Sequence, residues 1–225
     1  MNHIHLNSIP STQDYLMDNF ENPKEGILVS TNLQTQGKGQ YERAWKQFEG
    51  SLAFSFTLAP NPVITLSSLE IPVLIRNYLK EKFNIETKFK WPNDLMNTTG
   101  EKIGGILINR QGNHDLVIGV GINLWPIEHQ TDFLYKAGSL FKTRDEFDPK
   151  TLALEIYHYI LNNRLGSSQI IKAWNESCIY LNQKVEIKEN NISHHGVFQG
   201  LGDNGQALLF DGQKQLEIYT GSLFF

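Results

Sequence analysis

The sequence contains very little cysteine and no long apolar run. Cys178 is the only cysteine among 225 residues, so an internal disulfide is excluded. No stretch approaches the roughly 18 apolar residues of a transmembrane helix, and the start lacks the basic and then apolar order of a secretory signal. Because disulfide-free chains without such signals are typical of reducing compartments, we expect a cytoplasmic protein with no membrane association.

An excess of positive charge is also missing. Twenty Lys and Arg residues oppose 24 Asp and Glu residues, which gives a net charge of −4. Without an overall basic field, we expect no specific binding to DNA. Hydrophobic residues make up 40% of the chain and charged residues 20%, and a chain of this length can bury roughly 70–75% of its unfolded surface. Disordered and fibrous classes are therefore excluded.

Several common site motifs are absent: the sequence has no HExxH, no G-x-S-x-G and no Gly-x4-Gly-Lys-Ser/Thr phosphate loop. His194-His195 has no second pair at metal-ligand spacing, and we interpret it as a solvated turn. Cys178, at the end of an apolar helical pattern, is interpreted as a core residue.

Hydrophobic periodicity predicts alternating strands and helices followed by a small β region. The segment 51–58 alternates with period two, which predicts a half-buried strand. Ser11 to Asp14 resembles a capping box that opens a helix. Further strands are expected at 26–31, 87–91, 103–108 and 116–124, helices at 65–83, 149–163 and 170–178, and polar stretches at 32–50 and 128–148. From residue 183, short strands near 185–187, 196–198, 207–210 and 216–219 alternate with turn signals.

The predicted strand at 116–124 has one nearly bare face. Gly119, Gly121 and Asn123 alternate with large apolar residues, so the two glycines share a face. This pattern indicates either that a ligand lies flat on the face or that a backbone packs closely against it. The sequence leaves both interpretations open.

The polar segment 34–45 combines glycines with cations and a tryptophan. Gly37 and Gly39 would allow backbone N–H groups to approach an anion, Lys38 and Arg43 could neutralise phosphate, and Trp45 could cover an adenine. The alternative is a mobile surface loop with a core tryptophan.

Two further motifs place polar groups at strand ends. Lys90-Trp-Pro-Asn-Asp94 presents Asn93 and Asp94 after a rigid Trp-Pro step, although such pairs also occur in ordinary turns. Lys102 directly precedes the Gly104-Gly105 strand, where it could face a pocket or be a solvated neighbour of Glu101.

Together these motifs occur in the order and spacing of biotin protein ligases, and the chain resembles that family over essentially its whole length. The matching features are Ser11-Thr12, Gln34, the Gly37-x-Gly39 loop, Lys90-Trp-Pro-Asn-Asp94, Glu101-Lys-Ile-Gly-Gly-Ile-Leu107, Ile118-Gly-Val-Gly-Ile-Asn123, Trp174 and the terminal β region. The resemblance implies an α+β fold: a mixed β-sheet with packed helices, similar to class II synthetases, followed by a small SH3-like β-barrel. It places a catalytic domain at 1–181 and the β domain at 182–225.

The resemblance also implies an ATP-dependent ligase. Biotin and MgATP would give biotinyl-AMP and pyrophosphate, and the biotinyl group would pass to one lysine of a biotin carboxyl carrier protein. The catalytic residues carried over are Lys102, Asp94 and Arg43, with Asp94 also expected to hold Mg²⁺. The residues carried over for biotin are Ser11, Thr12, Gln34, Gly37, Lys38, Gly39, Lys102, Gly104 and Gly121. Those carried over for ATP are Lys38, Gln40, Arg43, Trp45, Asn93 and Asn123, and a bare face at Gly119 and Gly121 would form the floor beneath the ligand.

The chain departs from the family pattern in the loop, which usually runs Gly-Arg-Gly-Arg-x-Gly-Arg-x-Trp. Here Gln40 replaces a cationic residue and Glu42 replaces a glycine, which predicts weaker retention of the adenylate. Repressor members of the family carry an N-terminal helix-turn-helix domain, whereas the catalytic motifs here begin near the first residue, so we expect no role in transcription.

Two alternatives remain open at this point: a lipoate ligase or octanoyltransferase of the same fold, and a catalytically silent protein that binds biotin or nucleotide. A homodimer is compatible with either the ligase or its alternatives.

Overall fold

The computed structural model describes residues 2–20, 26–45, 50–111, 115–126, 136–143 and 148–225. The chain divides into two compact units, Met1–Pro60 with Glu101–Asn163, and Asn61–Gly100 with Arg164–Phe225. The predicted domain boundary between residues 181 and 182 stays a prediction. Residues 46–49 of the predicted loop and most of the polar stretch 128–148 lie outside the described ranges.

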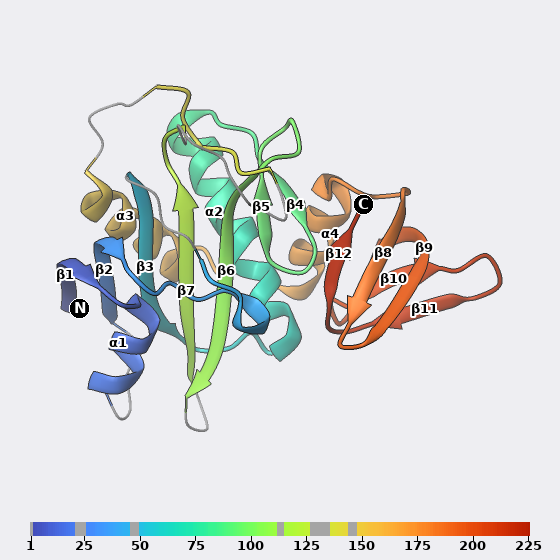
Figure 1. Cartoon of the computed structure of the whole chain (residues 1–225), viewed down its shortest axis with the longest axis horizontal. Coiled ribbons are helices and arrows are strands. Elements are labelled where there is room, and N and C mark those ends of the chain that lie inside the picture. Colours follow the sequence, from blue (N-terminus) through green and yellow to red (C-terminus); the bar gives the residue numbers. More distant parts are fainter. Residues whose placement is uncertain (1, 21–25, 46–49, 112–114, 127–135, 144–147) are drawn as a thin grey trace. The chain divides into compact units, whose positions relative to one another are not determined.

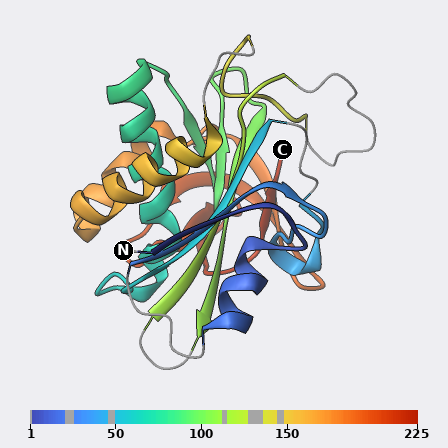
Figure 2. The same ribbon diagram turned by 90° about the vertical axis from the view of Figure 1, so that its left-hand side faces the viewer.

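The first unit is built on a mixed sheet. Its strands are β1 (Asn2–Ile9), β2 (Ile27–Gln34), β3 (Ser51–Leu58), β6 (Lys102–Gln111) and β7 (Asp115–Asn123). They follow the order β1-β2-β3-β7-β6, in which β1 and β2 are parallel and the other pairs antiparallel. Helices α1 (Thr12–Asn19) and α3 (Pro149–Asn162) lie on opposite sides of these strands (Figure 2).

Both faces of β3 are buried, so the half-buried strand predicted at 51–58 is wrong in its burial. On one face the Phe56 ring packs edge-on against Tyr157 of α3, with ring centroids 5.2 Å apart. On the other face the Ser55 hydroxyl lies 2.8 Å from the hydroxyl of Thr12 at the start of α1. Small polar residues on the second face therefore accommodate a helix and not solvent.

Strand β1 was not predicted, although Ile4 and Leu6 alternate with polar residues, because the alternation is short and no other apolar residue follows until Ile9. Its two histidines meet one hydroxyl: His3 Nε2 and His5 Nδ1 each lie 2.8 Å from Ser30 Oγ. Burial lowers the pKa of His3, with further contributions from the neighbouring charges of His5 and Lys150. Burial also lowers the pKa of His5, again with Lys150 adding to the effect. Both imidazoles are thus biased toward their neutral forms.

The second unit contains two helices, a short hairpin and the C-terminal sheet. The helices are α2 (Ser67–Phe83), preceded by a 3-10 turn at Ile64–Leu66, and α4 (Ser167–Ser177); the hairpin pairs β4 (Lys88–Lys90) with β5 (Asp94–Met96). Trp174 of α4 donates its indole N–H to Leu69 O of α2 at 2.8 Å and stacks on Phe89 of β4. The buried Trp174 thus joins both helices to the hairpin.

The C-terminal residues form a five-stranded antiparallel sheet in the order β11-β10-β9-β8-β12. Its strands are β8 (Lys184–Glu189), β9 (Ile192–Leu201), β10 (Ala207–Phe210), β11 (Gln215–Ile218) and β12 (Ser222–Phe224), drawn in orange and red in Figure 1. The predicted α+β class, a mixed sheet with helices followed by a small β region, is confirmed. β5 and β12 were not predicted, and His194-His195 lies within β9, so its interpretation as a turn is wrong.

Cys178 follows the last residue of α4 and is 7% exposed, as predicted for a core residue. Burial raises the pKa of its thiol to about 11, so the group is not a nucleophile at neutral pH. No helix in the described parts of the chain is long and apolar enough to cross a membrane.

Candidate active site

The first turn of α1 is joined to the end of β2 by a compact hydrogen-bond cluster. The backbone N–H and hydroxyl of Thr12 lie 2.8 and 3.1 Å from Gln34 Oε1 and donate to it. Ser11 caps the helix, its hydroxyl oxygen accepting from Asp14 N at 3.2 Å, as the capping-box pattern predicted. Ser11 and Thr12 are almost completely buried. Three residues expected to bind biotin therefore lie within one cluster.

Residues 37–45 fold back on themselves. Trp45 N donates to Gly37 O at 2.8 Å and Gly39 N donates to Arg43 O at 2.7 Å, around a 3-10 turn at Gln40–Glu42. A Cβ atom at Gly37 would lie only 2.6 Å from Trp45 O, so this close approach requires glycine. The segment has its own hydrogen-bonded turn, whereas the alternative interpretation was a mobile loop.

The indole of Trp45 packs against the bare face of the sheet. A Cβ atom at Gly121 would lie 2.5 Å from Trp45 Cε2 and 2.9 Å from Trp45 Nε1. Gly105, the partner of Gly121 on β6, would place a Cβ 3.5 Å from the same indole and 3.4 Å from Lys102 Nζ. The Lys102 ammonium lies 5.8 Å from the centre of the Trp45 ring. A cation, an aromatic ring and two glycines thus meet on one face.

The indole N–H of Trp45 is a buried donor without a hydrogen-bond partner among the described residues. Buried N–H groups are normally paired, since an unpaired one loses its hydrogen bond to water without replacement. The unpaired donor marks this face as one that can take a polar group.

The strand register assigns different roles to neighbouring glycines. Gly104 pairs with Ile122, whose side chain is on the opposite face, so Gly105 and not Gly104 shares the face of Gly121. Gly119 is covered by Gln13 of α1, whose Oε1 would lie 3.1 Å from a Cβ at this position. Gln13 Nε2 donates to Val117 O at 2.9 Å. Of the two glycines expected to form a ligand floor, one lies under Gln13 and the other under the Trp45 indole.

Three more of the expected residues lie in this unit with partners of their own. Lys38 Nζ forms an ion pair with Asp14 at 2.7 Å, which ties the 37–45 loop to α1. Asn123 Nδ2 donates to Gly138 O at 3.1 Å, and Ser51 Oγ donates to Asn123 Oδ1 at 3.4 Å. Arg43 lies over the ring of Tyr41, at 5.7 Å from the ring centre.

The remaining expected residues lie in the second unit, Asn93 in the turn between β4 and β5 and Asp94 at the start of β5. Asn93 and Asp94 are 9% and 6% exposed. Lys90 Nζ lies 3.7 Å from Asp94 Oδ2. Trp91 is buried and donates its indole N–H to Gly205 O at 3.2 Å. The turn therefore presents an amide and a carboxylate on an anchored backbone.

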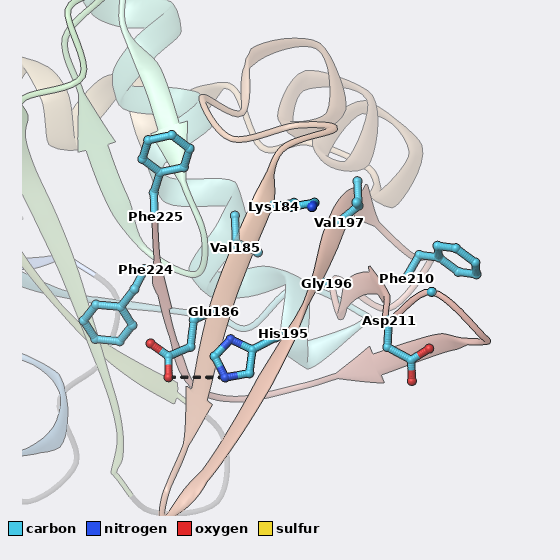
Figure 3. Close-up of a pocket in the computed structure, with 11 residues that line it drawn as sticks. Lys184, Val185, Glu186, His195, Gly196, Val197, Phe210, Asp211, Phe224 and Phe225 are labelled. Atoms are coloured by element: carbon cyan, nitrogen blue, oxygen red, sulfur yellow. Dashed lines mark ion pairs between the residues drawn. The ribbon is translucent and has the colours of Figure 1, made fainter.

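The same unit carries a separate pocket of about 690 Å³ on the C-terminal sheet (Figure 3). Its lining includes Lys184, Glu186, His195, Phe210 and Phe224. None of the residues expected to act on biotin or ATP lines it.

Comparison with known proteins identifies the family to which the chain belongs. Residues 6–123 match the biotin/lipoate A/B protein ligase family, which is more than half of the chain. The chain belongs to this family. The ligase shares 27% identity over 240 residues with the bifunctional ligase/repressor of Bacillus subtilis, covering 98% of this chain and 72% of that protein. It is 31% identical over 127 residues to chloroplastic biotin–protein ligase 1 of Arabidopsis thaliana, covering 52% of this chain and 34% of the plant protein.

A solved structure agrees over nearly the whole ligase. The biotin protein ligase of Aquifex aeolicus, in complex with biotin and ATP, superposes with a TM-score of 0.84 at 27% identity. The match covers 99% of this chain and 97% of that one. The predicted family and fold are thereby confirmed for the ligase.

Sequence reasoning missed two residues of the ligase that shape the site. Gln13 was part of the helix-start pattern, yet its contact with Gly119 joins residues more than a hundred positions apart. Asp14 was identified as part of a capping box, and it pairs with Lys38, a residue outside its own helix. A buried amide following Ser-Thr, and an acidic residue placed to meet the one cation between two glycines, are the signals that could have indicated them.

Proposed function

We propose that this ligase joins biotin to ATP, giving biotinyl-AMP and pyrophosphate, and then transfers the biotinyl group to one lysine of a biotin carboxyl carrier protein. The observation that carries the proposal is the packing of Trp45 on Gly121 beside the Lys102 ammonium. It supports a binding face with an aromatic wall and a cation at its edge. Family membership and the likeness to an enzyme solved with biotin and ATP support the same chemistry.

In the first step a carboxylate oxygen of biotin attacks the α-phosphorus of ATP, the bond from that phosphorus to the bridging oxygen breaks, and pyrophosphate leaves. Two anions must approach each other, so a fixed cation where negative charge accumulates lowers the barrier. We assign this role to Lys102 Nζ. Lys38 and Arg43, on the 37–45 loop, are assigned to the phosphates of ATP and its adenylate.

In the second step an uncharged lysine amine of the carrier attacks the acyl carbon of biotinyl-AMP. An amide bond forms, the acyl–phosphate bond breaks, AMP leaves with its negative charge, and the amine loses a proton. Water would compete with the amine, which gives the Trp45 indole a role in covering the adenylate.

The Ser11, Thr12 and Gln34 cluster is assigned to the ureido ring of biotin. That ring offers two N–H donors and one carbonyl acceptor, and the cluster offers hydroxyl and amide groups that can meet both kinds. Gly37, Gly39 and Gly121 are assigned to the same ligand. Gly104 faces the other side of the sheet from Gly121, so its assignment to this ligand rests on its backbone alone. Gln40, Trp45 and Asn123 are assigned to the nucleotide.

Mg²⁺ fits the donor set at the β4–β5 turn. Carboxylate and amide oxygens are the ligands that Mg²⁺ prefers, and it is usually held by one or two carboxylates together with substrate phosphates. Asp94 and Asn93 offer these two donors and are both nearly buried. When bound there, the ion would neutralise phosphate charge.

We further infer a cytoplasmic ligase whose acceptor is the biotinyl domain of a carboxylase, and a homodimer remains compatible with this function. With a net charge of −4, the chain has no overall basic field for DNA.

The test is ATP–pyrophosphate exchange with Mg²⁺ present and biotin, lipoate or octanoate supplied in parallel. We expect exchange that depends on biotin. Faster exchange with lipoate or octanoate would show that this acid, and not biotin, is the substrate. Exchange that depends on none of the three acids would indicate a protein that binds its ligand without catalysis.

A further inference from the structure

The side chain of Lys90 is buried, although lysine side chains are usually exposed to solvent. Its side chain is 4% exposed, and that of Asp94 is 9% exposed. A buried ammonium is stable only with compensating partners. Lys90 Nζ lies 3.7 Å from Asp94 Oδ2, and the two residues are paired across the β4–β5 hairpin. At 3.7 Å these two atoms form an ion pair and lie beyond ordinary hydrogen-bond distance.

The ammonium has a second partner in the C-terminal sheet. Lys90 Nζ lies 5.9 Å from the ring centre of Phe224 on β12, within the range of a cation–π interaction. Lys188 Nζ lies 5.0 Å from the same ring, but its side chain is 50% exposed. Phe224 is the cross-strand neighbour of Glu186, and Figure 3 shows both at one end of the pocket. One aromatic ring thus faces a buried lysine and an exposed one.

The backbone next to Lys90 is fixed by the same part of the chain. Trp91 donates to Gly205 O in the turn between β9 and β10. The hairpin turn is therefore attached to the C-terminal sheet at two adjacent residues, one through a backbone acceptor and the other through a ring.

We propose that Lys90 is a positioning residue, whose ammonium, near both the Asp94 carboxylate and the Phe224 ring, holds that carboxylate in the orientation used with Mg²⁺ and nucleotide. This inference rests on the proposed function, because it takes Asp94 as a nucleotide-site residue. The C-terminal sheet would then contribute to the formation of biotinyl-AMP, because β12 supplies the Phe224 ring that contacts the Lys90 ammonium.

The experiment compares Lys90→Met with Lys188→Met, which removes the exposed cation from the same ring. Binding of a non-hydrolysable ATP analogue is titrated against Mg²⁺, and biotin binding is measured without nucleotide. For Lys90→Met we expect the Mg²⁺ concentration for half-maximal analogue binding to rise by about tenfold or more, as for groups that orient metal ligands. Biotin affinity should stay within about twofold, and Lys188→Met should match the parent.

Removing one buried charge can prevent folding, so Phe224→Leu is the second variant. It keeps an apolar side chain on β12 and removes the ring, and it should shift the Mg²⁺ requirement in the same direction by a smaller factor. The inference is overturned if Lys90→Met leaves the Mg²⁺ requirement unchanged or lowers it, if Lys188→Met shifts it equally, or if biotin affinity falls in parallel.

Measurements on the parent protein distinguish a failure of this inference from a failure of the proposed function. If the parent shows biotin-dependent exchange and Mg²⁺-dependent analogue binding while Lys90→Met behaves like it, only the role of Lys90 fails. If the parent shows neither property, the proposed function fails first.

Discussion

Replacing Gly121 by alanine tests the contact between the sheet and the Trp45 indole. The added Cβ would lie 2.5 Å from Trp45 Cε2, about 1 Å inside the usual 3.5–4.0 Å separation of carbon atoms. The neighbouring glycine on β6 provides the control, since a Cβ at Gly105 would meet its nearest atoms at 3.4 and 3.5 Å. Gly121→Ala must therefore displace the indole, whereas Gly105→Ala need not.

The expected cost follows from the overlap. Overpacking a fitted contact costs about 1–3 kcal/mol, which corresponds to a loss of about fivefold to 150-fold in the population with Trp45 seated. The fold should survive, because alanine suits an extended strand and lowers the entropy of the unfolded chain. We expect the free energy of unfolding to fall by less than this cost, because the lower entropy of the unfolded chain offsets part of it, while ligand affinity falls by the stated factor.

Three measurements on both variants decide the matter: urea unfolding, calorimetric titration with biotin, and ATP–pyrophosphate exchange. Acrylamide quenching of tryptophan fluorescence reports whether Trp45 becomes more accessible in Gly121→Ala. Equal behaviour of the two variants would refute the reasoning. So would a Gly121→Ala protein that unfolds more easily and binds ligand normally in its folded fraction, because the glycine would then serve backbone packing.

Three further changes have expected outcomes. Lys102→Met should form biotinyl-AMP about a hundredfold more slowly, since one preorganised electrostatic donor typically contributes about 10²–10³-fold, and its melting temperature should match the parent. Gln40→Arg should slow the escape of biotinyl-AMP, because a charge-assisted contact to phosphate contributes about 1.5–3 kcal/mol. From about pH 7.5 to about pH 5.5 the free energy of unfolding should fall, since the lowered pKa values of His3 and His5 leave the unfolded state with more bound protons there. Replacing both histidines by asparagine should flatten this slope.

Each of these outcomes can be contradicted by one result. Near-normal adenylation by Lys102→Met would move the cationic role to Lys38 or Arg43. An unchanged dissociation rate in Gln40→Arg would mean that position 40 does not hold the adenylate. An unaltered slope in the double histidine variant would place the acid sensitivity outside β1.

The sequence predicted the elements whose signals are local. The helix start at Ser11, the β7 strand and the Asp148-capped helix α3 all follow from neighbouring residues, and each lies within a few residues of its expected bounds. Strand β1 escaped prediction because its polar/apolar alternation spans only a few residues, and its parallel pairing with β2 is visible only in the tertiary structure. The burial of β3 escaped because its polar face is covered by α1, and only the tertiary structure shows which element covers a face.

Residues of the candidate site divide in the same way. The motif glycines, Lys102 and the Asn93-Asp94 pair are visible in the sequence because they cluster in short segments. The role of Gly105 depends on strand register, because a shift by one residue would turn it to the other face of the sheet. The role of Gln13 depends on how α1 packs against Gly119. The Glu42 side chain, which replaces a family glycine, lies outside the described residues.

The second unit joins two stretches of chain, Asn61–Gly100 and Arg164–Phe225, and this has a consequence for synthesis on the ribosome. Trp91 leaves the ribosome long before its partner Gly205, which is 114 residues further along. A nascent chain that has emerged as far as Asn163 already contains the whole first unit, with the 37–45 loop and Lys102. We expect such a chain to acquire the residues assigned to biotin early and the support for Asp94 only at the end, so that biotin could be held before ATP is used.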